Sequence, residues 1–153
     1  GAFMYYDIDN RQNKYEITDG MEKLIVEVIK ECLSVEGKSD EYEVSISFVD
    51  NEEIRILNRD YRGVDKETDV LSFPMEDEFS LTTPILGDIV ISVEKADEQS
   101  REYGHSLDRE IAYLTAHSTL HLMGYDHMDD DEKSIMRNKE KTIMRNLKIF
   151  KNI

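Results

Sequence analysis

Three of the four histidines of this 153-residue chain lie within one short segment, HSTLHLMGYDH, from 117 to 127. His117 and His121 are four residues apart, so on a helix they lie one above the other, with Cβ atoms about 5–6 Å apart. Gly124 can adopt the left-handed conformation that ends a helix and turns the chain sharply. The turn would bring His127 back toward the first two imidazoles. The segment is therefore predicted to form a helix and a tight turn, with three imidazoles converging on one point.

Three neutral imidazoles that leave a fourth position open are the ligand pattern of a catalytic zinc ion. A structural zinc site would normally be closed by four protein ligands, usually including cysteines, and this chain has no cysteine near the segment. Nickel, copper or iron could occupy the same ligands, but imidazole suits zinc well. We therefore expect one Zn²⁺ ion held by His117, His121 and His127.

The residues between and around the three histidines leave several roles open. The spacing matches the metzincin pattern H-E-x-x-H-x-x-G-x-x-H, except that Ser118 stands where these proteases have the glutamate that acts as general base. Serine cannot take up a proton at neutral pH without a base of its own, which argues against a peptidase. Asp126 could orient a histidine from behind or cap a local turn. Tyr125 is expected to pack against the helix, and His105, the fourth histidine, to lie at the surface.

The hydrophobic pattern predicts a single domain over residues 1–153. Strands are expected at 3–8, 44–49, 70–73 and 86–93, where β-forming residues alternate or run together. Helices are expected at 21–33, 51–61, 94–103, 107–123 and 130–148, with capping residues before most of them. This order predicts one mixed sheet of about four strands with helices packed against it, an α/β or α+β domain. The metal site would lie on a late helix and the turn after it.

Charge and composition restrict where the chain acts. The formal net charge is −15, which argues against nonspecific binding to nucleic acid. Cys32 is the only cysteine, so there is no internal disulfide, and its place on an apolar helical stripe predicts a core residue. No apolar run approaches the roughly 20 residues that span a bilayer, and no secretory signal is recognisable. We therefore expect a cytoplasmic protein without membrane contact.

A local basic strip is hidden by the overall negative charge. Arg55, Arg59 and Arg62 follow one another at i, i+4 and i+7 on a short predicted helix, so they share one face. This face could bind an anionic ligand. It could equally be a solvated surface whose arginines pair with nearby carboxylates, namely Glu52, Glu53 and Asp60.

The segment 117–127 closely resembles the signature H-G-x-L-H-L-x-G-Y-D-H of the YbeY family of zinc-dependent endoribonucleases. It differs from that signature only at Ser118, where the family has glycine and where a hydroxymethyl group could narrow the site. Two further blocks also resemble the family: LNRDYR at 57–62 with TDVLSFP at 68–74, and LGDIVI at 86–91.

The resemblance implies an α/β fold, a zinc ion on His117, His121 and His127, and cleavage of single-stranded RNA in ribosomal RNA maturation and ribosome quality control. It further implies ribosomal RNA and ribosomal particles as partners. The functional arginine of the family falls on Arg62, which could stabilise the charge of the transition state. Two other functions stay open. One is a metzincin-like hydrolase of another substrate, and the other is a non-catalytic ribosome-assembly factor whose metal stabilises the fold.

Overall fold

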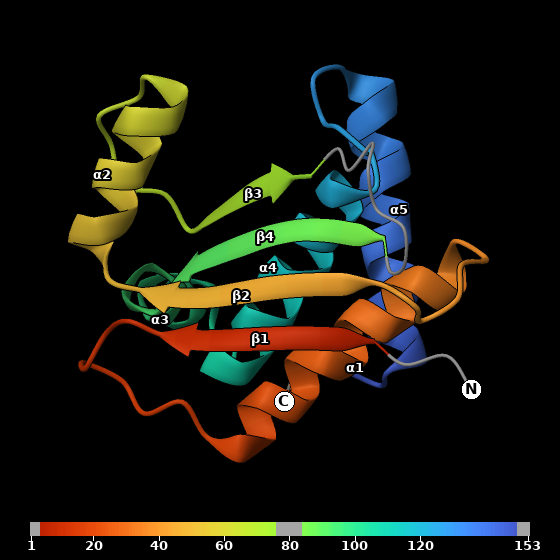
Figure 1. Cartoon of the computed structure of the whole chain (residues 1–153), viewed down its shortest axis with the longest axis horizontal. Coiled ribbons are helices and arrows are strands. Elements are labelled where there is room, and N and C mark those ends of the chain that lie inside the picture. Colours follow the sequence, from red (N-terminus) through yellow and green to blue (C-terminus); the bar gives the residue numbers. More distant parts are fainter. Residues whose placement is uncertain (1–3, 76–83, 150–153) are drawn as a thin grey trace.

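A computed structural model describes residues 4–75 and 84–149 of the chain (Figure 1). The described elements are, in chain order, β1 (Tyr5–Asn10), α1 (Asp19–Val35), β2 (Glu43–Val49), α2 (Asn51–Arg62), β3 (Val70–Pro74), β4 (Ile85–Ser92), α3 (Val93–Tyr103), α4 (Leu107–Leu122) and α5 (Asp130–Asn146). The predicted elements are confirmed in kind and order, and so is the α/β class. The first strand differs slightly, since it extends to Asn10, while Phe3 lies outside the described residues.

The four strands form one mixed sheet in the order β1-β2-β4-β3. β1 pairs with β2, and β2 with β4, in parallel, whereas β3 runs antiparallel to β4. The central strands β2 and β4 are mostly buried, whereas β1 and β3 form the two edges (Figure 1). Because parallel strands need helical connections, most helices cover the sheet. The β3 edge lies near the end of α4.

Helix α4 is the central helix of the fold. Ten of its sixteen residues are buried, so it has no wide solvent-facing side, as expected for a helix enclosed by other elements. Ile111 and Leu114 pack in the cluster with the sheet, while Ala112, Ala116 and Leu120 pack in a second cluster with α1 and α5. The backbone that carries His117 and His121 is therefore part of the core.

Gly87 lets the last turn of α4 lie close to the sheet. Its φ of +143° is a conformation that L side chains rarely adopt. A Cβ atom at this position would lie 2.4 Å from the carbonyl oxygen of Phe73 on β3 and 2.8 Å from Cδ2 of Leu122 on α4. Only glycine can therefore occupy the place where β3, β4 and the end of α4 meet.

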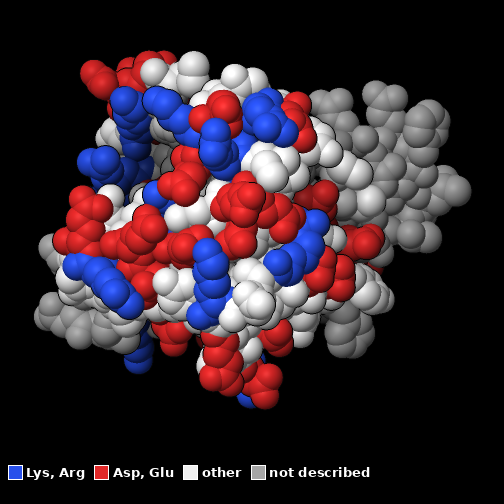
Figure 2. Space-filling model, turned by 90° about the vertical axis from the view of Figure 1, so that its left-hand side faces the viewer, with Lys and Arg blue, Asp and Glu red and all other residues white. Residues whose placement is uncertain are grey.

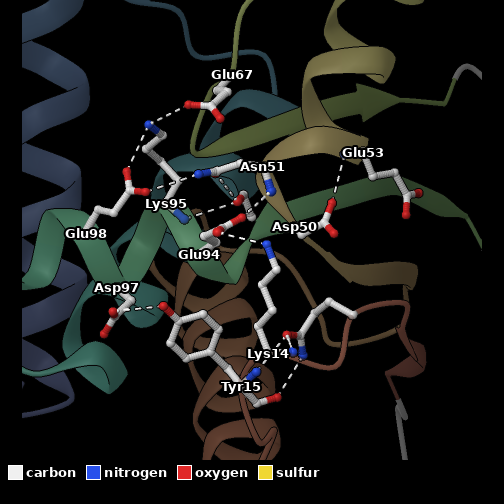
Figure 3. Close-up of polar contacts among 12 residues, drawn as sticks. Lys14, Tyr15, Asp50, Asn51, Glu53, Glu67, Glu94, Lys95, Asp97 and Glu98 are labelled. Carbon is white, nitrogen blue, oxygen red and sulfur yellow. Dashed lines mark hydrogen bonds and ion pairs between the residues drawn. The ribbon is translucent and has the colours of Figure 1, made fainter.

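A network of polar contacts fixes the start of α2 on α3 (Figure 3). The backbone N–H of Asn51 donates to Glu94 at 3.0 Å, and its side-chain amide donates to Glu98 at 3.2 Å. The buried hydroxyl of Ser92 donates to Oδ1 of Asn51 at 2.8 Å. Asp50 caps the helix by accepting from the N–H of Glu53. Because its first turn is held in this way, α2 projects its last residue, Arg62, toward the β3 edge.

None of the helices in the described ranges is both long and apolar enough to cross a membrane.

Candidate metal centre

The three histidines of the segment 117–127 meet at one point. His117 and His121 lie on α4, and the chain then turns at Gly124, where φ is +99°. The N–H of Tyr125 donates to the carbonyl oxygen of Leu120, which closes the turn. The ring centroid of His127 is 5.4 Å from that of His117 and 4.8 Å from that of His121.

This arrangement could hold a metal ion. One nitrogen from each of the three histidines lies within 4.8 Å of the other two. The predicted convergence of the three imidazoles is therefore confirmed. A tetrahedral ion on these nitrogens would keep one position for water or substrate, as catalytic zinc sites do.

Glu140 on α5 orients the first histidine. Its Oε2 lies 2.6 Å from Nδ1 of His117, and its Oε1 accepts a hydrogen bond of 2.9 Å from the hydroxyl of Tyr113. The carboxylate is buried, with the residue only 4% exposed. Since Nδ1–H donates to this carboxylate, Nε2 is the nitrogen of His117 left for a metal. A buried carboxylate behind an imidazole fixes its tautomer and raises its basicity.

Asp126 makes a different contact from Glu140. Its Oδ1 accepts a hydrogen bond of 2.7 Å from the N–H of His127, so it caps the local turn, which is one of the two roles the sequence left open. Its role in orienting a histidine stays a prediction. Sequence reasoning missed Glu140, because it follows His117 by 23 positions and lies in no motif.

The environment of His121 favours the neutral imidazole. Burial lowers the pKa of His121, and the nearby charges of His117 and His127 in their protonated forms lower it further. Only the neutral ring has a lone pair for a metal, so this shift favours binding near neutral pH.

A second polar cluster holds the turn that carries His127. The hydroxyl of Tyr125 donates to Glu36 at the end of α1, and Nζ of Lys139 on α5 lies 2.8 Å from the same carboxylate. Burial alone would raise the pKa of Glu36, but the hydrogen bonds from Lys139 and Tyr125 outweigh it and lower that pKa. Tyr125 thus anchors the turn to two helices and packs as the sequence predicted.

A cavity of about 480 Å³ opens at the three histidines. It is bordered by the β3 edge and by the end of α2, and it is lined by Arg62, His117, His121, Asp126, His127, Met128 and most residues from 68 to 74. The cavity thus brings Arg62 together with the histidine segment 117–127, although the two are more than fifty residues apart in the sequence.

The three arginines of α2 differ in their partners. Arg55 pairs with Asp65, with Nε–Oδ1 and Nη2–Oδ2 distances of 2.8 and 3.3 Å, and Arg59 pairs with Asp60 at 3.1 Å. Within residues 4–75 and 84–149, Arg62 pairs with no carboxylate and instead lines the cavity. The prediction of a solvated face whose arginines pair with carboxylates is therefore confirmed for Arg55 and Arg59. Asp60 was among the expected carboxylates, whereas Asp65, the partner of Arg55, was not, because it lies in the loop after α2.

Ser118 is not among the residues that line the cavity. It is fully buried, and its Oγ lies 2.5 Å from Oγ of Ser72 on β3. Its hydroxymethyl group therefore connects α4 to the sheet and does not narrow the site. It also cannot act as the base that the metzincin glutamate supplies.

His105 is not a surface residue, contrary to the prediction. Its side chain is only 5% exposed, and Nε2 lies 2.5 Å from Oε2 of the buried Glu110. Nη1 of Arg109 lies 2.8 Å from Nδ1 of the same ring. Both ring nitrogens are thus occupied by protein groups, and the residue does not line the cavity at the three histidines.

One face of the molecule carries a concentration of negative charge (Figure 2). Figure 2 shows the face on the left of Figure 1, where α2 and α3 lie, and Asp and Glu side chains form an almost continuous band across it. Lys and Arg side chains on this face lie in separate patches. On this face, the band would repel an anionic ligand, whereas the basic patches would attract it.

Comparison with known proteins gives consistent results. The family model described as "Endoribonuclease YbeY" matches residues 7–148. A protein of Thermoanaerobacter sp. (strain X514) with the name Endoribonuclease YbeY is 56% identical, over 93% of this chain and 96% of its own length. Proteins of the same name from Finegoldia magna and Clostridioides difficile are 49% and 52% identical, covering 97% and 93% of this chain and 97% and 95% of their own lengths.

A solved structure also resembles this fold. The solution structure of TM1509 from Thermotoga maritima superposes with a TM-score of 0.56 over 94% of this chain and 91% of that chain. The two sequences are 22% identical, so the likeness supports the fold alone.

Proposed function

The chain belongs to the YbeY family, and from this membership we propose that it is a zinc-dependent endoribonuclease that cuts single-stranded RNA. We further propose that it acts in the cytoplasm on ribosomal RNA, during its maturation and in ribosome quality control, in contact with ribosomal particles. The observation that carries the proposal is one cavity shared by three converging imidazoles and an arginine without a carboxylate partner among the described residues.

We assign one zinc ion to His117, His121 and His127. The donor set supports this assignment, because it consists only of imidazole nitrogens and one of them is backed by a buried carboxylate, Glu140. When bound, zinc supplies a water with a pKa lowered toward about 7 and polarises a phosphoryl oxygen.

The remaining chemistry belongs to residues of the chain. Arg62 is placed to bind a non-bridging phosphate oxygen with its planar, permanently charged guanidinium and so to stabilise the negative charge of the transition state. Glu140 keeps the Nδ1 proton on His117 and the ring in one orientation. The polar start of α2 on α3 fixes the helix that carries Arg62, and the Tyr125–Glu36 contact fixes the turn that carries His127.

Two other functions were open from the sequence. A metzincin-like peptidase would need a base beside the metal, and the residue at that position, Ser118, is buried against Ser72. A non-catalytic assembly factor would need the metal only for the fold, and it would not need an arginine without a carboxylate partner in the cavity. The relatives named as endoribonucleases also favour the first proposal.

The test combines metal content with RNA cleavage. The untagged protein and its His121→Ala variant, purified in the same way, would be analysed for bound metal by mass spectrometry and incubated with end-labelled single-stranded RNA. We expect about one zinc per chain and cleavage in the wild type, and neither in the variant. Chelator should abolish cleavage, and added zinc should restore it.

The other outcomes separate the alternatives. Bound zinc without cleavage of any RNA, free or in ribosomal particles, would favour the assembly factor. Cleavage of casein instead of RNA would favour the peptidase. Equal cleavage by the wild type and the His121→Ala variant would mean that the three histidines are not the active site.

A further inference from the structure

A second cavity lies between α4 and α5, behind the metal centre. It has a volume of about 380 Å³ and is lined by four basic residues, Arg109, Arg137, Lys141 and Arg145. The last three follow one another at i, i+4 and i+8 on α5, so they share one face of that helix. In a chain with a net charge of −15, four cations around one cavity are an unusual concentration.

These cations have no ion-pair partner within residues 4–75 and 84–149. Among the described residues, Arg137, Lys141 and Arg145 form no ion pair, whereas seven other Lys and Arg side chains do. In the same two ranges, Arg109 forms a side-chain hydrogen bond through one nitrogen, Nη1, which contacts His105. Its Nε is buried and has no hydrogen-bond partner in the described part of the chain. A buried donor without a partner is costly, and the residue that carries it lines the cavity.

The cavity also contains apolar surface. Tyr113 lines it, together with the side chains of Met144 and Ile149. A cavity that combines guanidinium groups with an aromatic ring fits a nucleotide, whose phosphate accepts from arginine and whose base stacks on an aromatic face. An acidic protein segment would use the cations but not the ring.

The cavity adjoins the metal centre. Arg109, Tyr113 and His117 follow one another every fourth residue on α4, and the separation of eight positions from the first to the last corresponds to about 12 Å along the helix. The rings of Tyr113 and His117 are stacked, with centroids 6.2 Å apart. Glu140 lines the cavity while its carboxylate accepts from both Tyr113 and His117.

From these observations we propose that the α4–α5 cavity binds a phosphate group of the RNA strand at a nucleotide next to the cleavage site. This proposal rests on the proposed function for its ligand, but not on metal or cleavage. It gives an acidic protein a positive contact for RNA that lies outside the metal cavity. It also predicts that RNA long enough to reach both cavities binds more tightly than RNA that fills only one.

The test measures binding without cleavage. The Lys141→Gln/Arg145→Gln variant would be compared with Lys23→Gln/Lys38→Gln, which removes the same charge from exposed lysines elsewhere. Binding of labelled 12-nucleotide and 3-nucleotide single-stranded RNAs would be followed by fluorescence anisotropy in chelator. The first variant should bind the 12-nucleotide RNA about tenfold more weakly. Its salt dependence should fall by about 1.4 in the slope of log K against log salt, which corresponds to two lost phosphate contacts.

Inorganic phosphate supplies a direct probe of the cavity. We expect it to raise the melting temperature of the wild type and of the Lys23→Gln/Lys38→Gln control, and to have less effect on Lys141→Gln/Arg145→Gln. These results would support the proposal even if the protein cleaved no RNA, and cleavage with unchanged binding would overturn it while leaving the proposed function intact.

Three other outcomes would also overturn the proposal. Equal weakening in both variants would indicate a general effect of charge. A loss of phosphate stabilisation without any change in RNA binding would mean that the cavity takes free phosphate. Competition by oligoglutamate but not by phosphate would point to an acidic protein partner instead of RNA.

Discussion

The described part of the chain contains two pairs of histidine and buried glutamate, and they differ in what surrounds the second ring nitrogen. His117 lies 2.6 Å from Glu140, and His105 lies 2.5 Å from Glu110. The other nitrogen of His105 meets Arg109, which can only donate, so this ring must be the neutral tautomer with its proton on Nε2. The other nitrogen of His117 is left beside two more imidazoles at a cavity. The same pair can thus be a structural contact or the support of a metal ligand.

The largest effect should separate the two histidines. We expect His117→Ala to lose the metal and to cleave RNA at least about 100-fold more slowly. His105→Ala should keep both the metal and cleavage. Each variant should lose about 1–3 kcal/mol of metal-free stability, because each leaves a buried carboxylate with one donor fewer. Metal analysis, cleavage rates and urea unfolding would check this, and metal loss in His105→Ala would break the comparison.

The next effect tests whether chemistry takes place in the cavity that His117 faces. Arg62→Gln should lower the rate of RNA cleavage about 100-fold with the metal content unchanged, because the variant loses a charge that stabilises the transition state. Arg59→Gln is the matched control, since Arg59 lies on the same helix but pairs with Asp60. Single-turnover cleavage rates would decide, and similar rates for the two variants would remove Arg62 from the mechanism.

The two glutamates should differ in their effect on metal affinity. Glu140→Gln keeps the shape of the contact but removes the charge, and we expect zinc to bind about 10–100-fold more weakly. Glu110→Gln should leave zinc affinity unchanged and lower only stability, by about 1–3 kcal/mol. Competition with a chromogenic chelator measures both. Equal zinc affinity in the two variants would show that Glu140 is no more than a structural contact.

A smaller effect concerns the residue next to His117. Ser118→Gly, which introduces the glycine of the family signature, removes the hydrogen bond to Ser72 and places glycine in the middle of α4. We expect a loss of about 2 kcal/mol in unfolding free energy, with cleavage changed by no more than a few fold. Thermal unfolding and cleavage assays on one preparation would test this. A large change in activity at full stability would mean that Ser118 acts on the cavity after all.

The smallest effect concerns the turn that carries His127. This turn belongs to the metal centre, and among the described residues no similar turn with a further histidine adjoins the pair of His105 and Glu110. Tyr125→Phe should cost about 1 kcal/mol at pH 7, because the hydrogen bond to Glu36 is lost. The pKa of Glu36 is lowered in the folded protein. Its contribution to stability is therefore complete above its unfolded pKa of about 4.3 and disappears as the pH falls through the lower folded pKa. The difference from wild type should shrink below about pH 4.

Urea unfolding of the metal-free protein across this pH range measures the difference. Tyr5→Phe is the control, because Tyr5 is exposed on β1. A difference between Tyr125→Phe and wild type that stays constant down to pH 3 would mean that the hydroxyl contributes without Glu36.

Local patterns in the sequence were sufficient for the elements and for the three histidines. Capping residues were expected before most of the helices, and Thr18, Asp50, Ser106 and Asp129 are the N-caps of four of them. A hydrogen bond of this kind links residues two or three positions apart, so the sequence contains it directly. The same holds for the helix and turn that bring the histidines together.

Contacts between distant elements could not be predicted. Glu140 reaches His117 only because of how α5 packs along α4, and Asp65 reaches Arg55 only through the loop after α2. His105 follows a glycine in a polar segment, which suggested exposure, but the fold of α3 against α4 encloses it. Such pairs depend on the position of one element relative to another, which no short pattern specifies.

The placement of the three histidines also determines how quickly a bound ion could be exchanged. His117 and His121 belong to the most buried helix, which opens only when much of the domain unfolds, whereas His127 lies in an exposed turn. For an ion bound here, release would begin with the departure of His127, and its rate would report the opening of that turn. The lifetime of the metal complex and the lifetime of the fold would then be separate quantities, set by the hydroxyl of Tyr125 and by the core around α4 respectively.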